Sequence, residues 1–135
     1  MIWTETYSEE TLNAAWASMN SPLRHVTLVD YEAFIDRAVD SHLVTAPMDA
    51  FEAMKPENTC QLDPVDEKRV DELVASAKLK TLGPQQPVIL GRFHDRTVIL
   101  TGNTRYRAAL QLNSDIRYLI IDFNEHAVCS SCWIA

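Results

Sequence analysis

The 135-residue chain has only three glycines, few basic residues in its first half and no apolar run long enough to span a bilayer. So few glycines exclude a collagen-like or glycine-rich low-complexity chain. The N-terminal stretch MIWTETYSEE lacks the basic and apolar regions of a signal peptide, so we expect a soluble cytoplasmic protein with no membrane contact. Three cysteines form no visible disulfide framework, which favours a reducing compartment.

The shortage of basic side chains is confined to the N-terminal half. Residues 1–60 hold three Lys or Arg against ten Asp or Glu, whereas residues 61–135 hold nine of each. The net charge of −7 therefore comes from the first half alone. Because DNA phosphates are bound by Lys and Arg, this composition argues against direct DNA binding. The apolar content of 47% is that of an ordinary globular protein, and the length predicts a single domain.

In the first half, the hydrophobic pattern predicts two helices and one strand. Thr6 and Glu9 resemble a capping box in front of a helix that ends near Met19. The run RHVTLV at 24–29 predicts a strand, and Asp30 is expected to cap the second helix. The residues of that helix expected to face inward are Phe34, Ala38 and Val39.

The rest of the chain predicts an α+β domain. A short helix at 48–54 and a turn at 56–58 are expected in a weakly patterned middle segment. The elements predicted after it are a helix from Pro64 to about Thr81, strands at 87–90 and 97–101 around a polar hairpin turn at 91–96, a helix at 105–112 and a strand at 116–123. The helix predicted from Pro64 to about Thr81 is expected to bury an apolar stripe, which consists of Val65, Val70, Leu73, Val74 and Ala77.

The most chemically suggestive stretch is LTGNTRYR, in which Gly102 separates a predicted strand from a predicted helix. A helix N-terminus presents unpaired N–H groups and the positive end of its dipole, which together favour an anion such as a phosphate. Gly102 would allow a close approach of the backbone, and Arg105 and Arg107 would add charge-assisted hydrogen bonds. The alternative is an ordinary strand-to-helix corner.

Residues 62–121, together with a first strand near 24–29, resemble the ParB/sulfiredoxin superfamily. The similarity lies in the order of LDPVDEKRVDELVASAKL, LGPQQPVIL and LTGNTRYRAALQL. It implies a small mixed sheet with packed helices at 62–123. Residues 1–61 would hold an N-terminal helical extension, the first strand and an insertion from about Arg37 to Gln61, and residues 124–135 would form a cysteine-containing tail. The resemblance covers no helix-turn-helix reading head, which also argues against direct DNA binding.

The resemblance implies a nucleotide site with an altered reactive group. In ParB proteins the corresponding turn is typically Gly-Glu-Arg-Arg and holds the phosphates and metal of a cytidine nucleotide. Gly102 and Arg105 match its outer positions, whereas Asn103 replaces the acidic residue and Thr104 the first arginine. In sulfiredoxins the residue at the position of Asn103 is the reactive cysteine. We therefore expect CTP or ATP to bind, with Mg²⁺ as a candidate companion ion, and we expect catalysis to be absent, reduced or altered because Asn103 replaces the reactive residue.

The residues predicted to bind the nucleotide or another phosphate ligand are Gly83, Gln85, Gln86, Gly102, Asn103, Thr104, Arg105 and Arg107. The GPQQP segment is included because it resembles the Gly-x-x-Gln-Pro turn that lines the nucleotide site of ParB proteins.

A second hypothesis treats the acidic first half as a docking surface. An immunity or inhibitor protein that blocks a basic partner, such as a nuclease toxin, would use acidic and aromatic side chains for this purpose. The candidate residues are Trp3, Glu5, Glu9, Glu10, Glu32 and Asp36. The alternative for the aromatic residues is packing of a helix on the sheet.

The spacing His126-x-x-Cys129-x-x-Cys132, with Cys60 elsewhere, provides four candidate zinc ligands. A lone Cys-x-x-Cys pair is also compatible with redox chemistry. The motif lies close to the end of the chain, so we favour an inert or packing role and expect no zinc.

Overall fold

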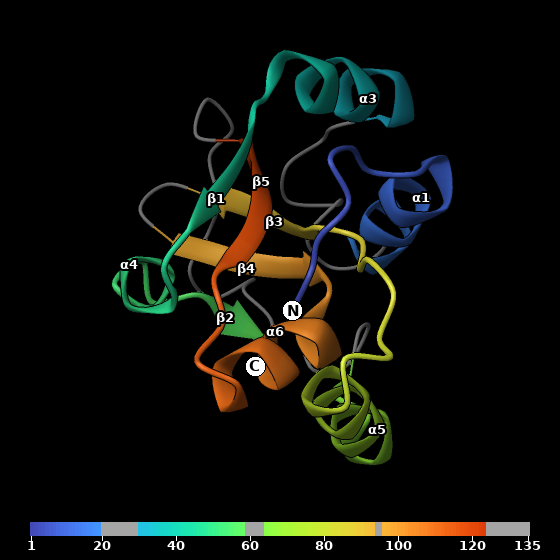
Figure 1. Ribbon diagram of the computed structural model, residues 1–135. Helices are drawn as coiled ribbons and strands as arrows, with labels where there is room; N and C mark the ends of the chain where they lie inside the picture. Colours follow the sequence, from blue (N-terminus) through green and yellow to red (C-terminus); the bar gives the residue numbers. More distant parts are fainter. Residues whose placement is uncertain (20–29, 59–63, 94–95, 124–135) are drawn as a thin grey trace.

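The computed structural model describes residues 1–19, 30–58, 64–93 and 96–123. In this part of the chain, five helices surround a five-stranded mixed sheet, which confirms the predicted α+β class (Figure 1). The elements in chain order are α1 (Glu9–Ser18), α3 (Tyr31–Asp40), β1 (Leu43–Ala46), α4 (Met48–Glu52), β2 (Glu57–Asn58), α5 (Glu67–Lys78), β3 (Val88–Phe93), β4 (Arg96–Thr101), α6 (Asn103–Gln111) and β5 (Ile116–Asp122).

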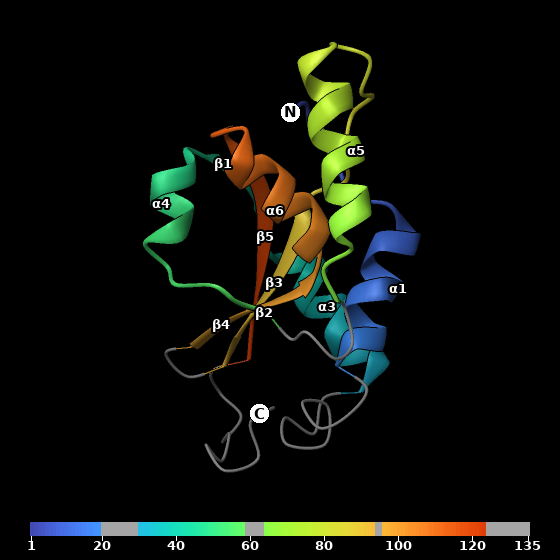
Figure 2. The same cartoon turned by 90° about the horizontal axis from the view of Figure 1, so that it is seen from below.

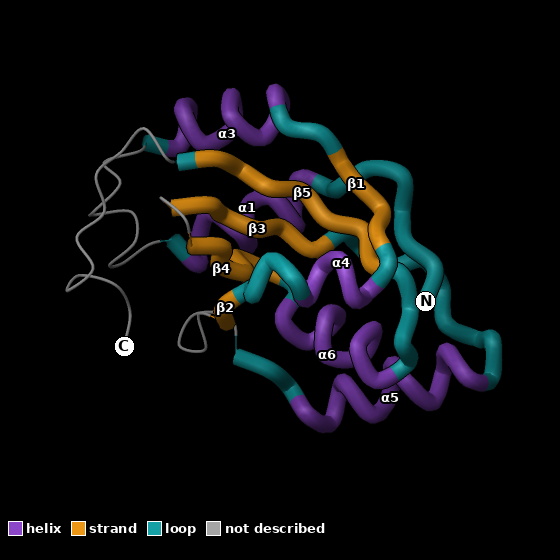
Figure 3. Tube along the Cα trace, turned by 90° about the vertical axis from the view of Figure 1, so that its left-hand side faces the viewer, coloured by secondary structure: helices purple, strands orange, loops and turns teal. Residues whose placement is uncertain are grey.

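The strand order is β1-β5-β3-β4-β2, which places β3 at the centre of the sheet (Figure 3). β3 pairs antiparallel with β4 and parallel with β5, so α6 forms the crossover between β4 and β5. Leu90 of β3 lies opposite Ile99 of β4 and Ile120 of β5. β1 pairs antiparallel with β5, and β2 pairs parallel with β4. The Gly102 turn therefore lies beside the start of the central strand.

The two faces of the sheet bury different helices, because side chains alternate along each strand. One face packs Ile89, Leu100 and Leu119 against α1 and α3. The other packs Leu90 and Ile99 against α4 and α6. α5 packs through Val70 and Leu73 on Ala108 of α6, and it lies beside α6 (Figures 2 and 3). The acidic helices α1 and α3 and the candidate phosphate site on α6 thus lie on opposite faces.

Three phenylalanines stack on the face covered by α1 and α3. The rings of Phe93 and Phe123 are 4.9 Å apart and nearly parallel, and the ring of Phe34 also stacks on Phe123, at 6.4 Å. All three side chains are fully buried. Because Phe34 comes from α3, this stack attaches the N-terminal half to the sheet.

The start of α1 differs from the prediction. The N-cap is Ser8, whose Oγ accepts a hydrogen bond from the Thr11 amide at 3.1 Å, so a capping box of Thr6 and Glu9 is wrong. The physical reason is that the Ser8 amide donates to Oε1 of Gln86 at 2.7 Å, which holds the chain at that residue.

The cap of the second helix is confirmed, since Oδ1 of Asp30 accepts from the Ala33 amide at 2.8 Å. Phe34 and Ala38 are buried as predicted. The inward placement of Val39 is wrong because its side chain is 67% exposed. It follows Ala38 by one residue, which turns it about 100° away from the buried face.

The edge strands come from the segment interpreted as an insertion. Leu43–Ala46 forms β1, and Glu57–Asn58 forms β2 where a turn was predicted at 56–58. Strands of four and two residues are too short to show a clear period of two, which explains why the pattern missed them. The short helix predicted at 48–54 is confirmed as α4, although it ends earlier. The strand predicted at 24–29 lies outside the described residues.

In the second half, the order of elements is confirmed and several boundaries move. α5 begins at Glu67, after the N-cap Asp66, and not at Pro64. Of its predicted stripe, Val70 and Leu73 are buried. The hairpin turn predicted at 91–96 is too long, because the fully buried Phe93 keeps β3 extended through that residue. α6 starts at Asn103, two residues before the predicted start of this helix.

None of the helices in the described ranges is both long and apolar enough to cross a membrane.

We expect Phe34→Ala to lower the free energy of unfolding by about 3–5 kcal/mol, because it removes a fully buried ring that packs on Trp16 and Phe123. Val39→Ala on the same helix should change it by less than about 0.5 kcal/mol, since this side chain is exposed. Urea denaturation followed by circular dichroism measures both values. Equal losses in the two variants would contradict the packing of α3 on the sheet.

Candidate functional site

The turn between β4 and α6 requires glycine at position 102. Gly102 is the N-cap of α6 and has φ 104°, in the left-handed region that residues with a side chain rarely adopt. A Cβ atom here would lie 2.9 Å from Nη2 of Arg105 and 3.2 Å from the Cα atom of Val88. Gly102 therefore permits the close approach of the α6 start to the start of β3.

The start of α6 differs from those of the other long helices in the described structure. α1, α3 and α5 have Ser8, Asp30 and Asp66 as N-caps with a side chain that accepts a backbone hydrogen bond, and each has an acidic residue in its first turn. The N-cap of α6 is a glycine without a side chain, and its first turn holds no acidic residue. The positive end of the α6 dipole is therefore not offset by a carboxylate of its own first turn, which favours an anion.

Arg105 joins the two turns that were predicted to form one site. Its Nη2 atom donates to the carbonyl oxygen of Pro87 at 3.1 Å, and its side chain is half-buried. Pro87 ends the GPQQP segment and directly precedes β3. The structure thus brings the Gly83–Pro87 and Gly102–Arg105 turns together through one guanidinium group.

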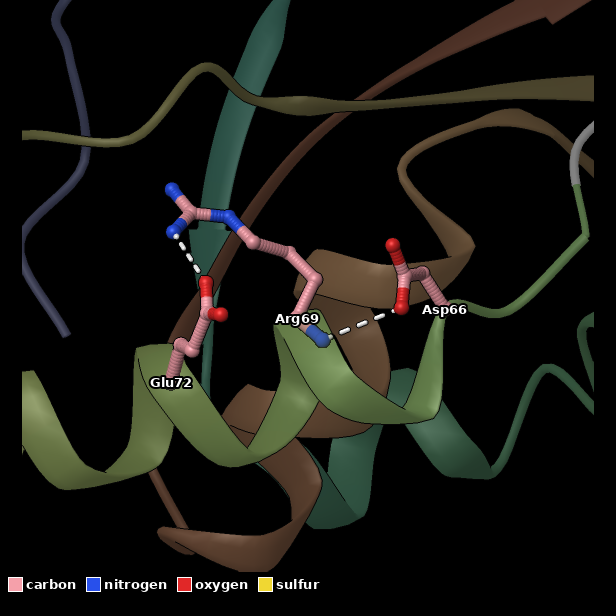
Figure 4. Close-up of polar contacts among 3 residues, drawn as sticks. All are labelled: Asp66, Arg69 and Glu72. Atoms are coloured by element: carbon pink, nitrogen blue, oxygen red, sulfur yellow. Dashed lines mark hydrogen bonds and ion pairs between the residues drawn. The ribbon is translucent and has the colours of Figure 1, made fainter.

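The start of α5 lies against the first turns of α6. The Asp66 amide donates to Oγ1 of Thr104 at 3.0 Å, and Arg107 forms an ion pair of 3.2 Å with Glu67. Figure 4 shows the Asp66 carboxylate accepting from the Arg69 amide, at 3.1 Å, as the cap of α5. Thr104 therefore links α5 to α6, and Arg107 is paired with a glutamate of α5.

Asn103 is the first residue of α6 and is fully buried. An amide side chain is neither an acid nor a base near neutral pH, so Asn103 offers hydrogen bonds and no proton transfer. The structure therefore places a polar but non-ionisable group where the resemblance puts the reactive residue.

Gln86 connects the GPQQP segment to the acidic first half. Its Oε1 atom accepts from the Ser8 amide at 2.7 Å and from Oγ1 of Thr11 at 3.0 Å. Because this oxygen has two partners at the start of α1, its role in the described structure is to hold that helix.

Gln85 and Gly83 lie beside the N-terminal segment. The backbone of Gln85 forms a parallel bridge with Trp3, through hydrogen bonds to Ile2 and Thr4 of 2.8 and 2.9 Å. The Gln85 side chain donates to the Gly83 carbonyl oxygen at 3.0 Å, and Gly83 itself is exposed. Arg105 contacts this turn through the carbonyl oxygen of Pro87, a residue outside the predicted set.

One half-buried hydrogen bond near the site had no signal in the sequence. The Tyr106 hydroxyl donates to Oε1 of Glu52 at 2.7 Å, which links α6 to α4 across 54 positions of the chain. Burial raises the pKa of Tyr106 well above its usual value, and the Glu52 charge raises it further. Tyr106 is therefore a neutral hydrogen-bond donor at physiological pH.

Within the described ranges, no group of three or more His, Cys, Asp or Glu side chains could hold a metal ion. The candidate zinc ligands Cys60, His126, Cys129 and Cys132 all lie outside those ranges. Near α6, the carboxylates of Asp66 and Glu67 already accept the bonds described above.

The structure divides the predicted partner-binding residues into two groups. Glu9 and Glu10 on α1 and Glu32 and Asp36 on α3 are exposed. These helices touch through Trp16 and Tyr31, whose rings are 5.6 Å apart. The remaining candidates, Trp3 and Glu5, lie beside β5, where the Trp3 indole donates to the Asp115 carbonyl oxygen at 2.9 Å.

No protein-family model and no curated protein matches the chain. The ParB/sulfiredoxin relationship therefore stays a prediction that rests on the motifs quoted above.

We expect Gly102→Ala to lower the free energy of unfolding by about 1–3 kcal/mol, because alanine is strained at φ 104° and its Cβ would meet Arg105 and Val88. Gly83→Ala is the matched control, since a Cβ there has no atom within 4 Å, and it should cost no more than about 0.5 kcal/mol. Thermal and urea unfolding measure both. A Gly102→Ala protein as stable as the control would contradict the left-handed turn.

Proposed function

We propose that the chain binds a phosphate-bearing ligand, with a nucleotide such as CTP or ATP as the expected class, at the N-terminus of α6. The observation that carries the proposal is the start of this helix. A left-handed glycine replaces a side-chain cap, no acidic residue occupies the first turn, and the half-buried Arg105 lies against the same turn. A helix start with an adjacent guanidinium suits a phosphate in both charge and hydrogen-bond geometry.

The net charge of the chain does not oppose this assignment. The acidic helices α1 and α3 pack on one face of the sheet, and α6 packs on the other. Exposed charges that are farther apart than about 8 Å are largely screened at physiological ionic strength. The local balance around Arg105 therefore matters more than the total of −7.

The proposed activity is binding without turnover. Nucleotide hydrolysis or a sulfiredoxin-type attack needs an ionisable or nucleophilic group near the phosphates, and position 103 holds an amide. A Mg²⁺ ion would be held mainly by the phosphate oxygens of the ligand, as is usual for this ion.

We expect millimolar CTP or ATP, with or without Mg²⁺, to raise the melting temperature by several degrees. Arg105→Gln should weaken binding by at least tenfold, because it removes the charged donor from the turn. Arg69→Gln makes the same charge change at an exposed position on α5 and should leave binding unchanged. Differential scanning fluorimetry and calorimetric titration measure the effect relative to each unliganded variant. No shift with any nucleotide, or equal binding by Arg105→Gln, would refute the site.

A second candidate function is capture of a basic protein by the face of α1 and α3. Four of the predicted acidic residues are exposed on these adjacent helices. A hollow of about 250 Å³, lined by Tyr31, Glu32, Ile35 and Asp36, lies on the same face. An aromatic ring beside two carboxylates suits a Lys or Arg side chain of a partner.

For this second candidate, we expect reversal of Glu9, Glu10, Glu32 and Asp36 to Lys to abolish capture of a basic partner by the tagged protein. Reversal of Asp71 and Glu72 on α5 is the control and should leave capture intact, because these exposed residues lie outside that face. Quantitative mass spectrometry of the captured proteins gives the comparison. Equal capture by both variants would rule out the acidic face as the binding surface.

A further inference from the structure

A groove of about 600 Å³ lies where the N-terminal segment passes the edge of the sheet. Its lining residues are Trp3, Thr4, Glu5, Thr6, Thr45 and Arg117. Thr45 of β1 and Arg117 of β5 are directly opposite each other in the antiparallel pair. Three segments that are far apart in the sequence therefore meet around the side chain of Arg117.

Arg117 is held in place by neutral partners. Its Nη1 atom donates to Oγ1 of Thr45 and its Nη2 atom to the carbonyl oxygen of Glu5, both at 2.8 Å. The side chain is half-buried and its Nε atom is fully buried. Within the described structure Arg117 forms no ion pair, whereas Arg69, Arg96 and Arg107 each pair with a glutamate. The position is thus a fixed positive charge without a carboxylate contact.

We propose that this groove binds a small oxyanion, a carboxylate or phosphate group of a small ligand, through Arg117. The two bonds use one proton on each Nη atom, so each of these nitrogens retains a second N–H. Guanidinium N–H groups of this kind donate charge-assisted hydrogen bonds to the oxygens of a carboxylate or phosphate. Because Oγ1 of Thr45 accepts from Arg117, its own proton remains to be donated to the same ligand.

An acidic residue of the groove limits the charge of the ligand. Glu5 is an exposed residue of the lining, and the backbone carbonyl oxygen of Asp115 accepts from the Trp3 indole. The negative charge of Glu5 repels a polyanion such as a nucleoside triphosphate more strongly than a group with one or two charges. The oxyanion site therefore differs from the candidate site at the start of α6 in its residues and in the class of ligand.

The test is a titration of the ¹⁵N-labelled chain with sodium acetate and, separately, with sodium phosphate, each at constant ionic strength adjusted with sodium chloride. We expect saturable shifts of the Trp3 indole, the Thr45 amide and the Arg117 Nε resonances, with a Kd in the millimolar range. The acetate and phosphate arms distinguish the two oxyanions. Linear shifts without saturation, or the same shifts with sodium chloride alone, would overturn the proposal.

Arg117→Gln should weaken the binding at least tenfold, and Arg69→Gln should leave it unchanged as the control for loss of one exposed charge. If Arg117→Gln loses the dispersed spectrum of the folded protein, Thr45→Val decides the question. This exposed position in a strand tolerates valine, and loss of the hydroxyl should weaken binding severalfold. Unchanged binding in Thr45→Val and in a folded Arg117→Gln would refute the assignment. The amides of Asn103 and Thr104 report the α6 site separately, so failure of one site is distinguishable from failure of the other.

Discussion

At Gly102 the chain leaves β4 with φ 104° and passes within contact distance of Val88, at the start of the central strand. A side chain here would separate the two segments, so the direction of α6 depends on this one conformation. The direction of α6 in turn determines where Thr104 and Arg107 meet the start of α5, and it brings Arg105 to the Pro87 carbonyl oxygen. The geometry of the candidate phosphate site thus depends first on the backbone conformation of Gly102. The side chain of Arg105 then supplies its positive charge.

The acidic first half is attached to this centre through hydrogen bonds as well as through apolar packing. Oε1 of Gln86 holds the start of α1, and the backbone of Gln85 pairs with the segment around Trp3. Both glutamines belong to the turn that ends at Pro87, the partner of Arg105. A ligand at the start of α6 would therefore lie close to a turn that also binds the N-terminal segment. This turn physically connects the acidic first half of the chain to the candidate site in the second half.

The elements with strong local signals could be predicted from the sequence, and those that depend on distant contacts could not. Periodic apolar residues predicted α5, and the Gly102 break predicted the junction of β4 and α6. The edge strands β1 and β2 were missed because strands of four and two residues form only when β5 and β4 offer a partner. In the site, Gly102 and Arg105 could be selected from the motif. The roles of Gln86, Tyr106 and Arg117 could not be predicted, because their hydrogen-bond partners lie 54 to 112 positions away in the chain. One partner of Arg117, Thr45, lies opposite it in the β1–β5 pair.

A chain with a net charge of −7 repels anions at long range, so any affinity for them has to come from short-range geometry. Both candidate sites have the same physical form: a half-buried guanidinium that is already oriented by a backbone carbonyl oxygen, Pro87 for Arg105 and Glu5 for Arg117. Orientation in advance reduces the entropy lost when a ligand binds. Partial burial also strengthens the interaction with an oxyanion relative to an exposed arginine. For such sites the directional hydrogen bonds select the ligand, and the overall charge mainly slows its approach.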